Sequence, residues 1–272
     1  MENMRRHESV HESVLRPWEY FVQPFPITDQ VYYVGNRWVG SFLIDTGDGL
    51  MLIDCGMPQT MYQVLENIRA LGFEPKDIRT ILITHAHYDH CGAAEAMRQY
   101  TGAKLYMGRE DAFFLTERPE LMLANEETCP LFHADCFYEK DTPVCQGNIA
   151  ILPVHTPGHT PGTYSLFFDA TVQGKKVRCG MHGGLGFNTL HDEFLEEYHL
   201  PKSLRRDFYE NLLRLRDLPV DLTIGSHPGV VSMLGKQATR KEGENPFLGR
   251  DEWKNLMERT MKRFQNTFGT LE

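Results

Sequence analysis

Residues 79–90, RTILITHAHYDH, decide how this chain can fold and what it can bind. The first half of the stretch is largely apolar and rich in β-branched residues, which predicts a buried strand. It runs directly into His85, His87, Asp89 and His90, four side chains of the metal-binding type within six positions. Residues two apart in extended backbone point to the same side, so the first two histidines can hold one ion. Asp89 and His90, at the turn into the next helix, can face a second ion.

Two further histidines complete the predicted set of ligands. His159 lies in the turn PGHTPG and His227 in the turn GSHPG, and each turn follows a predicted strand. Either histidine alone is more often a turn or core residue, but both recur at a strand's end followed by a rigid Pro/Gly turn. His155 is a weaker alternative ligand. We predict two groups of three ligands, which leave open positions for water and substrate: His85, His87 and His159; Asp89, His90 and His227. Such ligands favour two zinc ions, with iron or manganese as alternatives.

Length and charge limit the classes of partner. The 272 residues fit one α/β domain or two small ones, and 41% hydrophobic with 24% charged residues is ordinary for a globular protein. The formal net charge of -9 argues against nucleic acid and against an anionic membrane as partners. No apolar run approaches the roughly 18 residues that span a bilayer, and the charged N-terminus does not resemble a secretory signal. We therefore expect a cytoplasmic protein that acts on a small molecule, with its oligomeric state open.

The hydrophobic pattern predicts an α/β chain. Residues 30–54 predict an antiparallel meander, the first 25 residues an N-terminal arm, and residues 26–272 a single domain. Residues 117–147 carry no regular pattern, and we expect a long loop there that faces the substrate. Helices are expected where apolar residues recur at helical spacing: 61–71, 93–100, 204–215 and from 251 onward. The remaining strands are expected at 79–84, 104–107, 149–154, 163–170, 175–180 and 221–225.

Three motifs resemble the metallo-β-lactamase superfamily: THAHYDH at 84–90, HTPGHTPG at 155–162 and GLMLIDCG at 49–56. The chain is most similar to the third subgroup of class B β-lactamases, over about residues 28 to 235. The resemblance implies a four-layer αββα sandwich, with two mixed sheets flanked by helices. It also implies that three histidines hold one zinc ion and an Asp-His-His set the other. By the same match, Asp54 is expected to orient a ligand histidine.

One segment departs from that subgroup. Its members carry serines after the second hairpin that contact the substrate and the metal-bound water. This chain reads RCGMHGGLGFN at 178–188, with Met181 and Gly183 at the matching places. The bridging aspartate of glyoxalase II-like members is absent there too, so the segment argues against both β-lactam and thioester hydrolysis. We expect Trp38, Met181 and His182 to face the substrate, with a solvent-exposed loop histidine as the alternative for His182.

The predicted site is that of a hydrolase which needs no side-chain nucleophile. Two ions roughly 3.5–4 Å apart can bridge a water and lower its pKa toward about 7, and the bridging hydroxide would attack a carbonyl carbon. Asp89 is the expected catalytic residue, because its carboxylate can shuttle a proton. We expect cleavage of an amide or ester bond, β-lactam-like rings included, in a small molecule. A lactonase or thioesterase of the same fold is the alternative. A di-iron oxidoreductase is a further one, although its relatives usually carry Glu where His87 stands.

Overall fold

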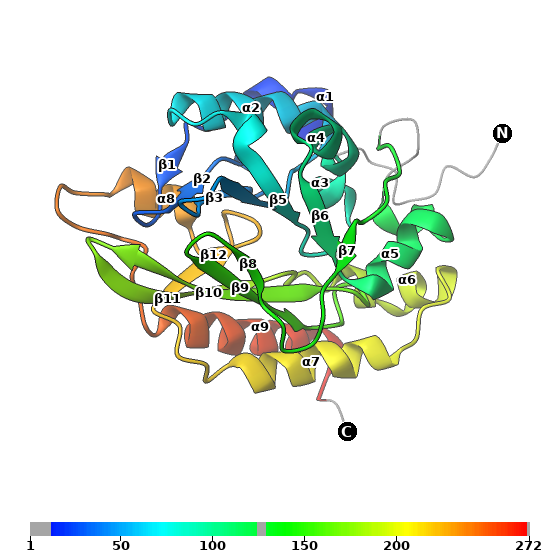
Figure 1. Cartoon of the computed structure of the whole chain (residues 1–272). Helices are drawn as coiled ribbons and strands as arrows, with labels where there is room; N and C mark the ends of the chain where they lie inside the picture. The colour runs from blue at the N-terminus through cyan, green and yellow to red at the C-terminus, as the bar shows by residue number, and fades with distance from the viewer. Residues whose placement is uncertain (1–11, 124–128, 271–272) are drawn as a thin grey trace.

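Two β-sheets face each other in the computed structural model, which describes residues 12–123 and 129–270. Helices lie outside the sheets, with these bounds: α1 (Glu12–Leu15), α2 (Met61–Ala70), α3 (Tyr88–Cys91), α4 (Ala94–Thr101), α5 (Arg109–Thr116), α6 (Asp192–Glu197), α7 (Ser203–Leu215), α8 (Met233–Ala238) and α9 (Glu252–Phe268). In Figure 1, α2 and α4 lie above the upper sheet, and α7 and α9 lie below the lower one. The layers are therefore helix, sheet, sheet and helix, which confirms the expected αββα sandwich.

The larger sheet has seven strands, which follow one another in the sheet as they do in the chain. Their bounds are β1 (Phe25–Pro26), β2 (Val31–Tyr33), β3 (Phe42–Asp45), β4 (Leu50–Ile53), β5 (Ile78–Leu82), β6 (Lys104–Met107) and β7 (Cys136–Phe137). The first four strands form the predicted antiparallel meander, and from β4 onward neighbouring strands run parallel. Helices α2 and α4 connect the parallel strands, because a parallel pair needs a long crossover.

The smaller sheet has five strands in the order β12-β11-β10-β9-β8. Their bounds are β8 (Val144–Gln146), β9 (Ile149–His155), β10 (Tyr164–Val172), β11 (Lys175–His182) and β12 (Leu222–Gly225). Strands β11 and β12 are parallel, and the other neighbours are antiparallel. The β10–β11 hairpin pairs Val172 with Lys175 at its turn and Leu166 with Met181 at its far end. Strand β11 therefore continues to His182, beyond the end predicted at residue 180.

Apolar side chains fill the space between the layers in two clusters. The larger cluster joins the two sheets to α7 and α9, and it contains the fully buried Phe168 and Trp253. The smaller cluster joins the opposite face of the larger sheet to α2 and α4, through residues such as Ile68 and Met97. Strand β4 lies between the two clusters, which explains its unbroken apolar sequence LMLI. Truncating a buried aromatic such as Phe168 to alanine would cost about 3–5 kcal/mol of folding free energy.

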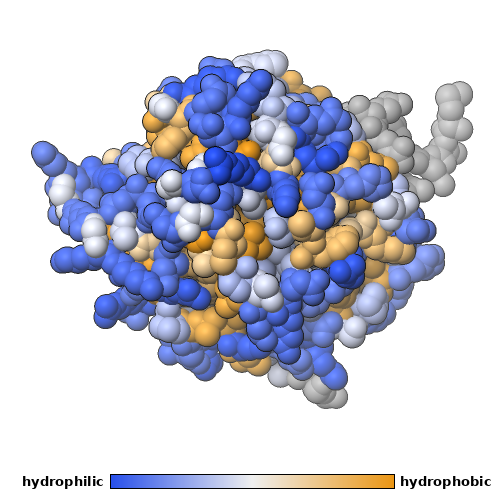
Figure 2. All heavy atoms as spheres, in the orientation of Figure 1, coloured by the Kyte–Doolittle hydropathy of each residue, from blue (hydrophilic) through white to orange (hydrophobic). Residues whose placement is uncertain are grey.

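The outer surface is mostly hydrophilic. Figure 2 shows hydrophilic side chains over most of one face, with apolar residues exposed in smaller groups between them. Within residues 12–123 and 129–270, no helix is long and apolar enough to cross a bilayer.

The described part of the predicted N-terminal arm packs against the rest of the molecule. The side-chain amide of Gln63, in α2, donates a hydrogen bond to the carbonyl of Pro17 at 2.5 Å. The backbone N–H of Arg37 donates to the carbonyl of Tyr20 at 2.9 Å. Residues 12–25 are therefore tied to α2 and to the loop before β3, while residues 1–11 of the arm lie outside the described residues.

Residues 117–147 are less irregular than expected. The described part contains a 3-10 turn at Pro119–Met122 and the short strands β7 and β8, while residues 124–128 lie outside it. Strand β7 adds to the parallel edge of the larger sheet, where Tyr106 pairs with Cys136. The expectation of one long loop was wrong here, because a strand of two or three residues is too short to produce a periodic pattern.

Candidate metal centre

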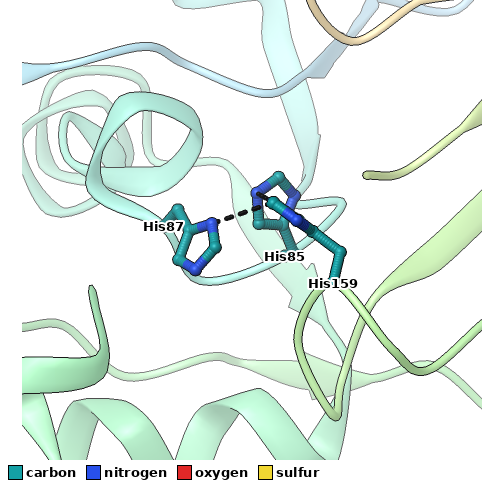
Figure 3. A group of neighbouring side chains, drawn as sticks. All are labelled: His85, His87 and His159. Carbon is teal, nitrogen blue, oxygen red and sulfur yellow. Dashed lines mark hydrogen bonds between the residues drawn. The ribbon is translucent and has the colours of Figure 1, made fainter. Parts of the chain in front are cut away.

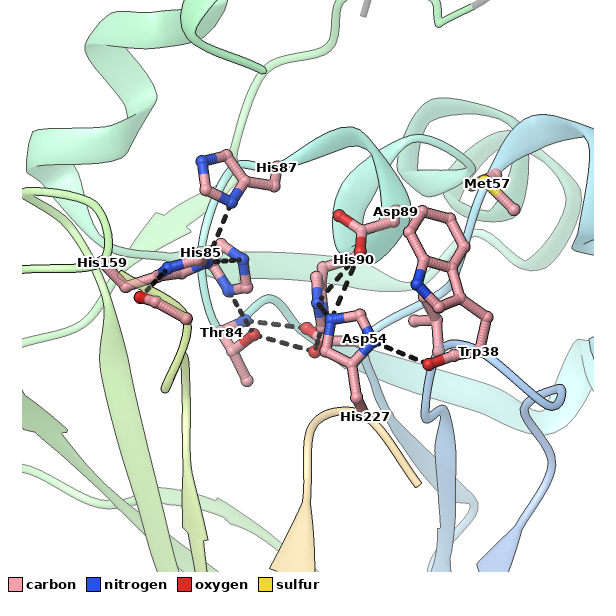
Figure 4. Close-up of polar contacts among 12 residues, drawn as sticks. Trp38, Asp54, Met57, Thr84, His85, His87, Asp89, His90, His159 and His227 are labelled. Carbon is pink, nitrogen blue, oxygen red and sulfur yellow. Dashed lines mark hydrogen bonds and ion pairs between the residues drawn. The ribbon is translucent and has the colours of Figure 1, made fainter. Parts of the chain in front are cut away.

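The predicted ligands come together where loops leave the ends of both sheets (Figure 4). A hydrogen bond of 2.9 Å from the backbone N–H of Tyr164 to the carbonyl of Thr84 joins the loops of the two sheets. The ligands are distributed as follows: His85 and His87 in the loop after β5, Asp89 and His90 in α3, His159 in the turn between β9 and β10, and His227 directly after β12.

The first group brings three histidine nitrogens to one point (Figure 3). The Nε2 atom of His159 lies 3.2 Å from Nε2 of His85 and 3.0 Å from Nδ1 of His87. A tetrahedral zinc ion with nitrogens at about 2.0–2.1 Å has ligand-to-ligand edges of about 3.3 Å. The spacing of the three nitrogens therefore fits one such ion.

The second group, Asp89, His90 and His227, has the same dimensions. The Nε2 atoms of the two histidines are 3.2 Å apart, and Asp89 Oδ2 lies 3.6 Å from Nε2 of His90 and 3.4 Å from that of His227. Burial opposes protonation of His90, but the carboxylates of Asp89 and Asp54 outweigh it and raise the pKa of this ring. The two groups are neighbours, since the rings of His85 and His90 have centroids 4.2 Å apart.

Backbone carbonyls fix the tautomers of His159 and His227. Nδ1 of His159 contacts the carbonyl oxygen of Gly186 at 2.7 Å, and Nδ1 of His227 contacts that of Trp38 at 2.6 Å. A carbonyl oxygen can only accept a hydrogen bond, so each Nδ1 must carry the proton. In the neutral rings, both Nε2 atoms therefore present a bare lone pair.

Asp54 fixes the other two rings from the end of β4. Its carboxylate accepts hydrogen bonds of 2.8 Å from Nδ1 of His90, from the backbone N–H of Thr84 and from the Thr84 hydroxyl. Since the Thr84 hydroxyl donates to Asp54, its oxygen accepts from Nδ1 of His85 at 3.1 Å. When neutral, the rings of His85 and His90 therefore also present bare Nε2 atoms, and the carboxylate of Asp54 contacts the ring of His90.

The resulting arrangement suits a cation. Two bare lone pairs cannot form a hydrogen bond, yet they face each other at 3.2 Å between His85 and His159. The Nε2 atoms of His90 and His227 are the same distance apart. Burial lowers the pKa of His85 and His87 well below the usual value, and neighbouring imidazoles lower it further. Burial also lowers the pKa of His159 to about 4. These rings are therefore neutral near pH 7, the form that binds a metal ion.

Comparisons with known proteins agree with this geometry. A family model described as the metallo-beta-lactamase superfamily matches residues 39–171. The subclass B3 metallo-beta-lactamase BJP-1 of Bradyrhizobium japonicum is 26% identical, with a TM-score of 0.79 over 93% of this chain and 96% of BJP-1. Native FEZ-1 from Legionella gormanii is 26% identical, with a TM-score of 0.82 over 91% of this chain and 96% of FEZ-1. The chain belongs to the metallo-β-lactamase superfamily.

This superfamily member is also similar to lactonases. The N-acyl homoserine lactonase of Bacillus thuringiensis is 25% identical over 166 residues, which are 51% of this chain. The match spans 61% of the lactonase's own length, so it covers less than two thirds of that protein. The chain thus combines the metallo-β-lactamase fold with two candidate groups of metal ligands, as a metal-dependent hydrolase of this superfamily would.

One carboxylate that the sequence motifs did not indicate contacts two of the ligand loops. Asp111, in α5, is 0% exposed and accepts hydrogen bonds from Ala86, Thr160 and Gly162. Burial raises its pKa to about 6, against the effect of these hydrogen bonds. An acidic residue in the first turn of a helix is common. The sequence therefore gave no reason to connect Asp111 with a loop about fifty residues away.

The structure places Met181 and His182 differently from our expectation. His182 is 2% exposed, and its ring packs against Phe208 of α7 with centroids 6.5 Å apart. Successive strand residues point to opposite faces, so the fully buried Met181 points toward the core between the sheets. Neither side chain lines an open surface, and the alternative of a solvent-exposed His182 is wrong as well. The reason is that β11 continues through both residues, where we expected a loop.

Trp38 lies beside the second group of ligands. Its half-buried ring packs at a tilt against the ring of His227, with centroids 5.9 Å apart (Figure 4). The ring of Tyr88 has its centroid 6.2 Å from that of Trp38. Its role in facing the substrate stays a prediction. His155, the weaker alternative ligand, has Nε2 2.8 Å from the carbonyl of Pro161 and lies outside both groups.

Proposed function

We propose that this chain is a two-metal hydrolase, with zinc in both positions, that cleaves an amide or ester bond in a small molecule. The observation that carries the proposal is the convergence of imidazoles whose ring orientations are fixed by Asp54, Thr84 and two backbone carbonyls. A protein interior does not bring the bare lone pairs of His85 and His159 to within 3.2 Å of each other without a compensating positive charge. Divalent cations with a preference for nitrogen ligands supply that charge.

Bound zinc ions would supply Lewis acidity, which polarises a carbonyl group and lets water act as a nucleophile near neutral pH. The chain would hold one ion with His85, His87 and His159 and the other with its second group. The side chain of Asp89 is 11% exposed, so its carboxylate is the ligand through which a proton could pass between solvent and the leaving group. The low pKa of His159 would keep this ligand neutral well below pH 7.

The surroundings of the site favour a substrate with an apolar part. Trp38 and Tyr88 form a half-buried aromatic wall beside His227. On the side of His87 and His159, the apolar side chains of Leu121, Phe194, Leu200 and Leu204 line a recess of about 10 Å³, which is no larger than one water molecule needs. Leu121 belongs to the 117–147 segment, and the role of this segment in facing the substrate stays a prediction.

A lactone is the second, narrower candidate, and Gly183 favours it over a β-lactam. Gly183 stands where the β-lactamase subgroup carries a substrate-binding serine. A Cβ atom at this glycine would lie 2.1 Å from the carbonyl oxygen of Tyr164, so no serine fits here without a shift of the backbone. Met181, at the other serine position, is buried. The two serines of that subgroup are therefore absent here, and part of the chain is also similar to a lactonase.

The proposal can be tested with the zinc-loaded protein and a panel of β-lactams, lactones and thioesters. We expect hydrolysis of at least one lactone or ester, abolished in His227→Ala and retained in His155→Gln, which changes a histidine outside both groups. Failure on the whole panel by a protein that carries zinc would count against the function. If elemental analysis found iron instead, with turnover that depends on oxygen, the di-iron oxidoreductase would replace it.

A further inference from the structure

Asp111 joins two ligand-bearing loops that are far apart in the sequence. Its Oδ2 atom accepts a hydrogen bond of 2.8 Å from the backbone N–H of Ala86, the residue between His85 and His87. The same atom accepts one of 2.7 Å from the hydroxyl of Thr160, the residue after His159. These are the two loops that carry the first group of ligands.

A third hydrogen bond fixes the later part of the second loop. The backbone N–H of Gly162 donates to Oδ1 of Asp111 at 2.6 Å. The approach is so close that a Cβ atom at Gly162 would lie 2.4 Å from the backbone nitrogen of Asp111 and 2.6 Å from its Cγ. Gly162, the second glycine of the turn PGHTPG, is therefore required because a side chain there would collide with helix α5.

We propose that Asp111 is a positioning residue for the metal group formed by His85, His87 and His159, although α5 carries no ligand. The inference rests on the proposed metal-binding function. Asp111 should affect the geometry of this group alone. Its hydrogen bonds reach the loops that carry His87 and His159. None of these bonds reaches a residue of the second group.

The chemistry of the three donors explains why a carboxylate is needed here. Two of them are backbone N–H groups, which can only donate, and the Thr160 hydroxyl is the third. An ionised carboxylate offers acceptors at both oxygens, so all three bonds form at once. Asparagine has one acceptor and one donor, and therefore its NH2 group would face a backbone N–H across a gap of about the present 2.6–2.8 Å. Asp111→Asn would thus release one loop from the other with little change in size.

The test measures zinc binding by competition with a coloured chelator in wild-type protein, in Asp111→Asn and in Glu110→Gln. Glu110 is an exposed acidic neighbour on the same helix, and its change should leave both affinities as they are. In Asp111→Asn we expect one of two zinc affinities to fall by about 10- to 100-fold, the usual range for residues that support a ligand. The other affinity should stay at the wild-type value. In a parallel experiment, cobalt takes the place of zinc. The absorption spectrum of the cobalt ion that stays bound in Asp111→Asn should match that of the ion bound in His159→Ala, which identifies the weakened group.

Hydrogen exchange in the metal-free protein gives an independent readout. The amides of Ala86 and Gly162 should exchange faster in Asp111→Asn than in wild type, whereas those of β10 should not. If Asp111→Asn does not fold, Thr160→Val keeps the carboxylate and removes one donor, and it should weaken the same group to a smaller degree. Two unchanged zinc affinities in a folded Asp111→Asn or Thr160→Val protein would overturn the inference. A wild-type protein that binds no zinc would instead overturn the proposed function.

Discussion

Replacing His182 by leucine should make the stability of the metal-free protein less dependent on pH. His182 lies under α7, and its Nδ1 accepts a hydrogen bond of 3.3 Å from the backbone N–H of Gly184. Its Nε2 atom is buried and has no hydrogen-bond partner among the described residues. Burial therefore lowers the pKa of this ring to about 3, from an ordinary value of 6.5.

The size of the effect follows from that shift. Between pH 6.5 and pH 3 the unfolded chain binds a proton at His182 and the folded chain does not, so acid favours unfolding. Each pH unit in this window is worth about 1.36 kcal/mol. At pH 4.5, two units below the unfolded pKa, the loss amounts to about 2.7 kcal/mol, and at pH 7.5 it is close to zero.

The assay is urea unfolding of chelator-treated wild-type and His182→Leu protein at pH 7.5, 6.5, 5.5 and 4.5. The other titrating groups are common to both proteins, so the difference between the two curves isolates His182. The unfolding free energy of His182→Leu minus that of wild type should increase by about 2.7 kcal/mol when the pH falls from 7.5 to 4.5. Parallel curves would show that this imidazole is hydrated in the folded state, and the burial argument for β11 would be refuted.

Two further changes test the ligand geometry and the rim of the site. Gly184→Ala places a Cβ atom 2.2 Å from Cδ2 of His159. It should therefore displace that ring and lower the affinity for one zinc ion by about tenfold or more. Gly229→Ala has open space around its Cβ and is the matched control, and equal zinc affinities for the two variants would contradict this reasoning. Trp38→Ala keeps the backbone carbonyl that accepts a hydrogen bond from His227, so the zinc content should stay the same. KM should rise by about tenfold, which corresponds to a loss of roughly 1.4 kcal/mol of binding free energy. An unchanged KM would place the substrate away from this ring.

The sequence revealed most of the site because the chemistry is written in short motifs. HAHYDH brings four ligand-type residues into six positions, and the Pro/Gly turns around His159 and His227 place those residues at strand ends. The layers of the fold were predicted from the resemblance. The spacing of apolar residues alone indicates only whether a segment is a helix or a strand.

Other features depended on tertiary contacts that no local pattern encodes. The carbonyls of Trp38 and Gly186 fix two ring tautomers, and any residue could supply a backbone carbonyl. Asp111 meets its partners only after α5 packs against both loops. Strand β11 extends two residues beyond the predicted end. Met181 and His182 are therefore buried strand residues, whereas we expected them to face the substrate.

The central claim is that the two groups of side chains hold two ions, and the metal content of the purified protein tests it most directly. Elemental analysis after loading with zinc should find two ions per chain in wild type and one in Asp89→Ala or His227→Ala, because each variant removes a ligand of the second group alone. The same number of ions in wild type and in both variants would contradict the account.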